Sequence, residues 1–161
     1  MRSLCALSVP HPRAIAAAMK RSSQALRSWY VAMFQLPAIP EATLGSRDGR
    51  LFEASLVRSG LDRATARRYA ARSTEPGGIT GPIGWYRALP LAGQRTGAVT
   101  VPTLYVWGDR ERYVSRRAAE GCAAWVTGPY RFVVLPGRTH WLPTTAAGEV
   151  AQLVLDHLVA N

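Results

Sequence analysis

The sequence predicts an α/β fold in which a parallel sheet is interrupted by a long helical insertion. Three short apolar runs predict the strands: SLCALSV at 3–9, VPTLYVWGD at 101–109 and YRFVVLPG at 130–137. Each run ends at a proline or a glycine, and its apolar residues follow one another without alternation, as in strands buried on both faces. Helical patterns follow the second and third runs, an order typical of a parallel sheet covered on both sides.

The elements divide the chain into three segments. Residues 1–10 hold the first core strand, which Pro10 ends. Residues 11–98 alternate helical stretches with breakers such as LPAIPE and TEPGGITGP and contain no convincing strand pattern, so we expect a helical cap. Residues 99–161 supply two strands and two helices, the last with an apolar face at helical spacing, so we expect the C-terminal part of the core.

Length and composition indicate a globular chain with a hydrophobic core. The 161 residues are 48% hydrophobic and 19% charged, which excludes a disordered chain. No apolar run reaches the roughly 18 residues of a membrane span. Pro10, His11 and Pro12 stand where a signal peptide would have its small-residue cleavage site, so we expect a cytoplasmic protein with no membrane partner.

The net charge of +10 is strongly basic, and 19 of the 20 basic residues are Arg. These residues are dispersed, and no basic block with interleaved aromatics appears. We therefore expect no nucleic-acid partner and keep a basic nucleic-acid binder as a minor alternative. Cys5 and Cys122 lie far apart without C-x-x-C spacing, which argues against a metal site or a disulfide framework.

Ionisable side chains follow the second and third predicted strands. Asp109 and Glu111 come directly after one strand, and His140, in PGRTHWLP, comes after the next. The carboxyl ends of parallel strands meet at one edge of a sheet, where ligand chemistry gathers. An acid there can orient a histidine, which then takes a proton from a nucleophile or from water. A surface histidine in a turn is the alternative, and the residues alone leave open which carboxylate is the acid.

Three stretches, VPTLYVWGDRERYVS, GPYRFVVLPGRTHWLP and the final amphipathic helix, resemble the C-terminal part of α/β-hydrolases. Within that superfamily the chain most resembles the epoxide hydrolases. SWYVAMFQLP and GWYRALP resemble two cap segments of that family that each carry a tyrosine, here Tyr30 and Tyr86. The opening SLCALSVPHP resembles the strand and loop before the cap. The resemblance implies a partial α/β-hydrolase fold, with C-terminal parallel strands and helices and an inserted helical cap.

The resemblance also implies the roles of these residues. Tyr30 and Tyr86 would hydrogen-bond the oxygen of a small hydrophobic epoxide and assist its protonation as the ring opens. An upstream Asp would attack carbon to form an alkyl-enzyme ester, and His140 would activate water to hydrolyse that ester to a diol. No metal or organic cofactor is implied.

The acid of the family usually occupies the second acidic position of a G-D-x-D pattern. Here the pattern reads GDRE, so the matching residue is Glu111, and Asp109 remains the alternative. Haloalkane dehalogenases share this catalytic tail but not usually the tyrosine pair, and a haloalkane dehalogenase-like hydrolase is a further alternative.

The nucleophile half of the family pattern is absent from the sequence. No G-x-S-x-G, H-D-x-G or H-G-x-P motif occurs, Asp48 lies in the cap region, and Ser8 and Cys5 lack flanking glycines. We therefore expect a truncated gene or a misassigned start, and a chain that is inactive alone. A non-enzymatic remnant, or a module that self-associates or pairs with a missing N-terminal half through an exposed apolar edge strand, is the other alternative.

Overall fold

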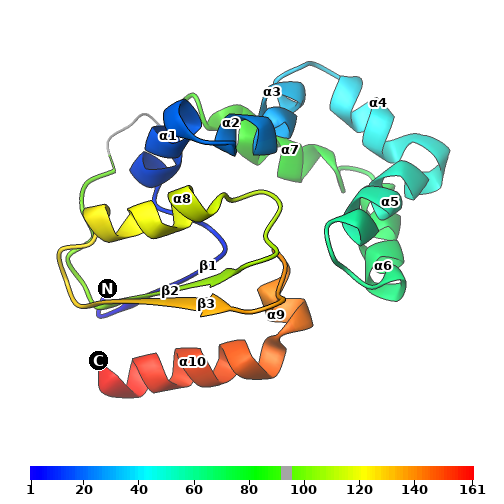
Figure 1. Cartoon of the computed structure of the whole chain (residues 1–161). Helices are drawn as coiled ribbons and strands as arrows, with labels where there is room; N and C mark the ends of the chain where they lie inside the picture. Colours follow the sequence, from blue (N-terminus) through cyan, green and yellow to red (C-terminus); the bar gives the residue numbers. More distant parts are fainter. Residues whose placement is uncertain (92–95) are drawn as a thin grey trace. The chain divides into compact units, whose positions relative to one another are not determined.

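The computed structural model describes residues 1–91 and 96–161 and separates into two compact units (Figure 1). The first, called the sheet unit, consists of Met1–Arg27 and Gln94–Asn161. The second, called the helical unit, consists of Ser28–Gly93. The described residues include no helix with the length and apolar character needed to cross a membrane.

The sheet unit is built on three parallel strands, β1 (Leu4–Leu7), β2 (Thr103–Gly108) and β3 (Tyr130–Leu135). Their order in space is β1-β2-β3, so β2 is central and is buried along its whole length. The residues of β1 are only half-buried, because within the described sheet this strand has a neighbour on one side only. The predicted parallel sheet with its apolar strands is confirmed.

Helices cover both faces of this sheet (Figure 1). On one face lie α1 (Pro12–Arg21), α8 (Arg116–Glu120) and the short helix η2 (Gly121–Trp125), and on the other lie α9 (Leu142–Thr145) and α10 (Ala147–Ala160). The two faces carry separate hydrophobic clusters, with β2 side chains alternating between them. The second cluster consists of Leu104, Val106, Leu135, Leu142, Ala146 and Val150.

The first two helices belong to the sheet unit, whereas the sequence led us to expect a cap that begins at residue 11. Ala14 and Ala18 of α1 are buried against the sheet in one cluster with Tyr105 and Trp107. Small alanines on this face let the helix approach the sheet closely. The helix α2 (Gln24–Arg27) follows directly, so the separate helical unit begins only after it.

All secondary structure in the described part of the helical unit is helical. Its elements are α3 (Trp29–Phe34), α4 (Ile39–Gly45), η1 (Ser46–Gly49), α5 (Arg50–Arg58), α6 (Arg63–Ser73) and α7 (Thr80–Ala88). Asp62 caps α6 by accepting a hydrogen bond from the Thr65 amide at 3.0 Å, and this bond lowers the pKa of Asp62.

Arg87 of α7 ties this unit together. Its guanidinium donates to both carboxylate oxygens of Glu41 on α4, at 2.6 and 3.1 Å, and to the carbonyls of Phe34 and Leu36. The Arg87 hydrogen bond holds the pKa of Glu41 below its ordinary value. One planar side chain thus connects α7 to α4 and to the end of α3.

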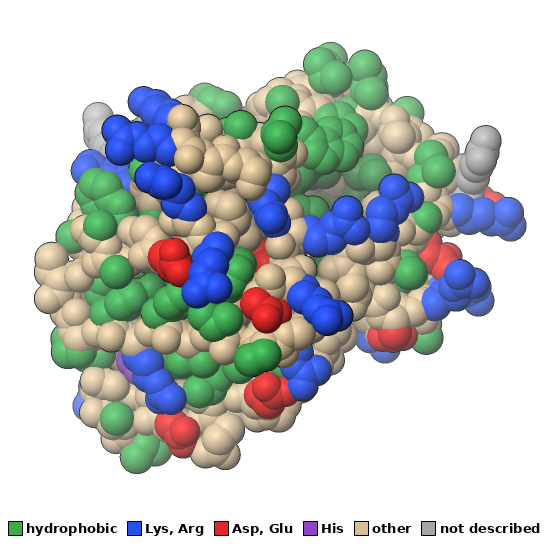
Figure 2. All heavy atoms as spheres, in the orientation of Figure 1, with side chains coloured by type: hydrophobic (Ala, Val, Ile, Leu, Met, Phe, Trp, Pro, Cys, Tyr) green, Lys and Arg blue, Asp and Glu red, His purple; other side chains and the backbone are tan. Residues whose placement is uncertain are grey.

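The basic residues form no continuous band on the face of the molecule drawn in Figure 2. Lys and Arg side chains are scattered among acidic and hydrophobic ones on that face. This distribution matches the dispersion of arginines along the sequence. It gives no support to a basic nucleic-acid-binding stripe on that face.

Candidate active site

Two loops meet at the carboxyl ends of β2 and β3. A Cβ atom at Gly108, the last residue of β2, would collide with the carbonyl oxygen of Arg138 in the loop after β3. Only glycine permits this approach, and the amide of Arg110 then donates to the same carbonyl at 3.0 Å. The loop that carries Glu111 is therefore held against the loop that carries His140.

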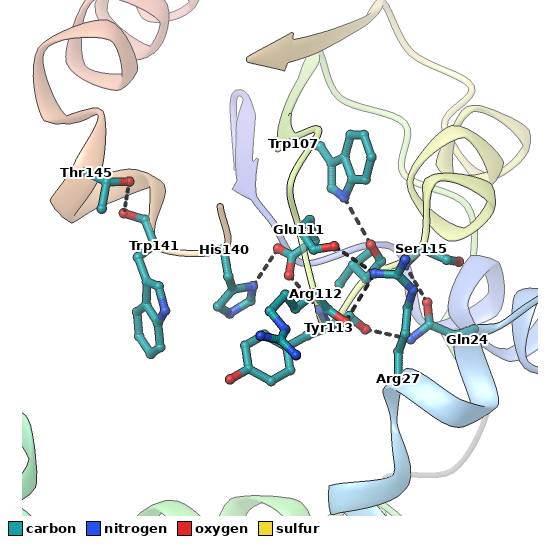
Figure 3. Close-up of polar contacts among 11 residues, drawn as sticks. Gln24, Arg27, Trp107, Glu111, Arg112, Tyr113, Ser115, His140, Trp141 and Thr145 are labelled. Atoms are coloured by element: carbon teal, nitrogen blue, oxygen red, sulfur yellow. Dashed lines mark hydrogen bonds and ion pairs between the residues drawn. The ribbon is translucent and has the colours of Figure 1, made fainter. Parts of the chain in front are cut away.

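The site centres on a hydrogen bond between Glu111 and His140 (Figure 3). Oε2 of Glu111 lies 2.7 Å from Nδ1 of His140, and the Tyr113 amide donates to Oε1 at 2.8 Å. The Glu111 side chain is 0% exposed, whereas that of His140 is 28% exposed. With Nδ1 as the donor to the carboxylate, Nε2 carries the lone pair that can accept a proton.

Aromatic rings fix the orientation of the imidazole. The Tyr113 ring lies edge-on to His140 with a centroid separation of 5.0 Å, and the Trp141 ring does the same at 5.4 Å. Edge-to-face contacts of this kind are favourable and directional. The imidazole is thus held by one hydrogen bond and two ring contacts, with a quarter of its side chain open to solvent.

Asp109 occupies a different position from Glu111. Its Oδ1 accepts a hydrogen bond from the amide of Gly137 at 2.6 Å, in the turn that follows β3. Gly137 has φ of +71°, a conformation that favours glycine. Asp109 therefore stabilises a turn whose shape depends on Gly137. The geometry favours Glu111 over Asp109 as the partner of His140.

The two tyrosines singled out in the sequence lie side by side in the helical unit. Tyr30 on α3 and Tyr86 on α7 have ring centroids 5.7 Å apart in an edge-to-face arrangement. Phe34 completes a three-ring cluster, 5.6 Å from Tyr30 and 5.0 Å from Tyr86. Gln35 donates to the carbonyl of Tyr86 at 2.9 Å, which links the end of α3 to α7.

The other candidate nucleophiles are poorly suited to attack. Ser8 lies just after β1, and its hydroxyl is buried without a hydrogen-bond partner in the described part of the chain. Burial raises the pKa of the Cys5 and Cys122 thiols, which disfavours their thiolates. Asp48 lies in η1, away from any strand-to-helix turn of the described chain. Within residues 1–91 and 96–161, no group of three His, Cys, Asp or Glu side chains could hold a metal ion.

Sequence reasoning missed the side chains that hold the acid loop. Gln24 and Arg27, both on α2, contact the backbone of the segment from Glu111 to Ser115 (Figure 3). The sequence offers no signal for this role, because Gln24 and Arg27 stand among other polar residues in RSSQALRS.

Comparisons with known proteins agree with the fold. The chain is 29% identical over 169 residues to Epoxide hydrolase 3 of Xenopus tropicalis, and this match includes 96% of the chain but 45% of the relative. It is also 29% identical to the AB hydrolase superfamily protein YfhM of Bacillus subtilis, matching 98% of the chain and 57% of the relative. No family model matches.

Solved structures show the same fold at lower sequence identity. An inhibitor complex of Bacillus megaterium epoxide hydrolase superposes with a TM-score of 0.80 at 17% identity, over 98% of this chain and 61% of that one. Epoxide hydrolase I of potato (Solanum tuberosum) gives a TM-score of 0.73 at 22% identity, over 100% and 63%.

The chain spans about half the length of the curated relatives it matches. The chain is therefore similar to epoxide hydrolases and to another AB hydrolase over nearly its whole length, and it has part of the fold of the solved epoxide hydrolases.

Proposed function

We propose that this chain supplies the water-activating pair and the cap tyrosines of an epoxide hydrolase, which converts an epoxide to a diol through an alkyl-enzyme ester. The observation that carries the proposal is the 2.7 Å contact between His140 Nδ1 and the fully buried Glu111 carboxylate. A buried carboxylate with both oxygens hydrogen-bonded can hold an imidazole in one tautomer and stabilise its protonated form.

The hydrolytic step is assigned to His140. Nε2 accepts a proton from water, and the resulting hydroxide attacks the carbonyl carbon of the ester. The bond between the carbonyl carbon and the alkoxy oxygen of the ester then breaks. The alkoxy oxygen takes the proton back from the imidazolium, and the diol leaves. Glu111 stabilises the positive charge on His140 while that proton is held, and Glu111 itself stays ionised.

The ring-opening step is assigned to the tyrosine pair. The hydroxyls of Tyr30 and Tyr86 donate to the epoxide oxygen, and one of them gives its proton as the C–O bond of the ring breaks. The edge-to-face contact between the two rings, at 5.7 Å, supports this assignment because it keeps both tyrosines on one small patch of the helical unit. A small hydrophobic epoxide is the substrate class.

The attacking carboxylate is assigned to a segment outside these 161 residues, because the sequence contains no H-D-x-G motif and Asp109, which follows β2 directly, is engaged by the Gly137 amide. That segment would pair with the outer edge of β1, which has no strand neighbour within the described sheet. Unpaired strand edges are ready templates for a further strand. We expect the isolated chain to self-associate through this edge, which light scattering after gel filtration measures.

A cavity beside β1 supports the same assignment. It has a volume of about 250 Å³ and an almost entirely apolar lining that includes Leu4, Ala6 and Cys122. The hydroxyls of two further lining residues, Tyr105 and Tyr130, are buried without a partner in the described part of the chain, and burial raises the pKa of both. Buried neutral hydroxyls without acceptors are costly, so a completing segment that offers acceptors would stabilise the sheet unit.

A chimera tests the proposal directly. The N-terminal part of Epoxide hydrolase A of Mycobacterium tuberculosis, a relative 27% identical to this chain, is joined to residue 1 to give what we call the completed enzyme. We expect the completed enzyme to convert a hydrophobic aryl epoxide to its diol, and the 161-residue chain to show no turnover. Turnover by the 161-residue chain alone, or a folded completed enzyme whose turnover is unchanged by His140→Ala, would overturn the proposal.

A further inference from the structure

The acid Glu111 lies on a loop that has no regular secondary structure of its own. Between the end of β2 at Gly108 and the start of α8 at Arg116, the backbone forms only turns and bends. Such a segment does not hold a side chain in place through its own hydrogen-bond ladder. Its order must come from contacts with neighbouring elements, and α2 supplies them.

Arg27 at the end of α2 binds the backbone on either side of the acid. Its Nη1 donates to the carbonyl of Glu111 at 2.7 Å and to that of Arg112 at 3.2 Å, and its Nε contacts the hydroxyl of Ser23 at 3.4 Å. Hydrogen bonds from a guanidinium are stronger than those between neutral groups. This cation binds the backbone carbonyl of Glu111, while Oε2 of the same residue contacts His140.

Gln24 at the start of α2 holds the next part of the loop. Its side chain is fully buried, its Nε2 donates to the carbonyl of Tyr113 at 2.8 Å, and its Oε1 accepts from the amide of Ser115 at 2.7 Å. A buried amide with partners at both ends is costly to remove, because each lost partner leaves a polar group unsatisfied.

Tyr113 links this contact to the catalytic pair. Its amide donates to Oε1 of Glu111 at 2.8 Å, and its ring packs against the imidazole of His140. A continuous chain of contacts therefore runs from Gln24 through Tyr113 to both members of the pair (Figure 3). A shift of the Tyr113 backbone would therefore disturb both the hydrogen bond to Oε1 of Glu111 and the aromatic ring that packs against His140.

We propose that Gln24 and Arg27 form a clamp on the acid loop and are positioning residues for the Glu111–His140 pair, an inference that rests on the proposed function. They touch neither substrate nor reacting atoms, and they act by fixing the backbone from Glu111 to Ser115. Both clamp residues and the acid loop belong to the sheet unit. The clamp therefore joins α2, the last helix before the helical unit, to the loop that carries Glu111.

The test observes the imidazole N–H of His140 by ¹H–¹⁵N NMR on the 161-residue chain with labelled histidine. In the unaltered chain we expect a hydrogen-bonded Nδ1–H signal that exchanges slowly with water. In Arg27→Met and in Gln24→Met we expect this proton to exchange at least about tenfold faster, because the loop opens more often. Arg116→Met is the matched control, since Arg116 forms an exposed ion pair with Glu120 on its own helix, and the His140 signal should not change.

Two outcomes separate the clamp from the proposed function. Glu111→Ala, which removes the acceptor of the Nδ1–H hydrogen bond, should abolish the slow exchange, and if it does not, the pair itself is wrong and the proposed function fails with it. If Glu111→Ala acts as expected but both clamp variants exchange like the unaltered chain, the clamp is overturned while the pair stands. Arg27→Lys, which keeps one cationic donor at a half-exposed position, should give an intermediate rate, and it replaces Arg27→Met if that variant does not fold.

Discussion

The two units of this chain position their functional side chains by different means. In the sheet unit, Glu111 and His140 are held by directed polar contacts around a buried carboxylate. In the helical unit, Tyr30 and Tyr86 are held by aromatic packing around Phe34. The polar pair depends on the exact identity of each partner, whereas the aromatic cluster depends on shape. Conservative substitutions of Glu111 or His140 should therefore damage the pair in the first unit. Conservative substitutions of Tyr30 or Tyr86 should have little effect on the fold of the second unit.

Removal of the base is expected to have the largest effect. In the completed enzyme, His140→Gln should lower diol formation by at least about 10³-fold, because the variant lacks the imidazole nitrogen assigned to accept the proton from water. Steady-state turnover of an aryl epoxide measures this. Thermal unfolding of the same variant checks that it is folded. A loss below tenfold would mean that another group activates the water.

The acid comes next, and the chain provides its own matched control. Glu111→Gln should lower diol formation by about 10²-fold, because the amide no longer stabilises a positive imidazolium. Asp109→Asn should have a much smaller effect, because Asn can still accept the hydrogen bond from the Gly137 amide. Equal losses from the two changes would show that the assignment of Glu111 over Asp109 is wrong.

The tyrosine hydroxyls should each contribute about tenfold to ring opening. Tyr30→Phe and Tyr86→Phe keep the edge-to-face packing with Phe34, and the melting temperature of each variant checks its fold. Tyr69→Phe on α6, in the same unit, is the control and should leave turnover unaltered. The rate of ester formation in the pre-steady-state burst shows whether ring opening is the slowed step. A burst in both variants as fast as that of the unaltered completed enzyme would exclude the tyrosines from ring opening.

The smallest effect concerns stability at acid pH. Because Arg87 lowers the pKa of Glu41 in the folded state, this contribution to stability is complete above the ordinary Glu value of 4.5 and is lost as pH falls through the lowered pKa. Arg87→Met should remove that part of the acid sensitivity, measured by urea unfolding across pH. Arg67→Met should not, since Arg67 is exposed and lies 3.8 Å from Glu53.

The strands could be predicted from the sequence because their apolar runs end sharply. SLCALSV and YRFVVLPG are stopped by proline or glycine, and the structure places β1 and β3 within those runs. The boundary of the helical unit could not be predicted. The alanine-rich face of α1 indicates that something packs against it, but helical periodicity does not say whether that partner is the sheet or another helix.

The acid shows a second limit of sequence reasoning. The sequence GDRE offers two carboxylates, and their spacing alone does not decide between them. The decision depends on side-chain length and on the turn at the end of β2. The shorter Asp109 reaches the Gly137 amide, while the longer arm of Glu111 reaches His140. Resemblance pointed to Glu111, and the geometry supplies the physical reason.

The most direct test of the central claim is mass spectrometry of the completed enzyme carrying His140→Gln after incubation with an aryl epoxide. If His140 hydrolyses an ester formed on the other segment, the variant should gain the full mass of the epoxide, and the added mass should map to an Asp of that segment. The unaltered completed enzyme should release diol without a lasting adduct. A variant that stays unmodified while diol formation continues at the unaltered rate would contradict the assignment of His140 as the water-activating base.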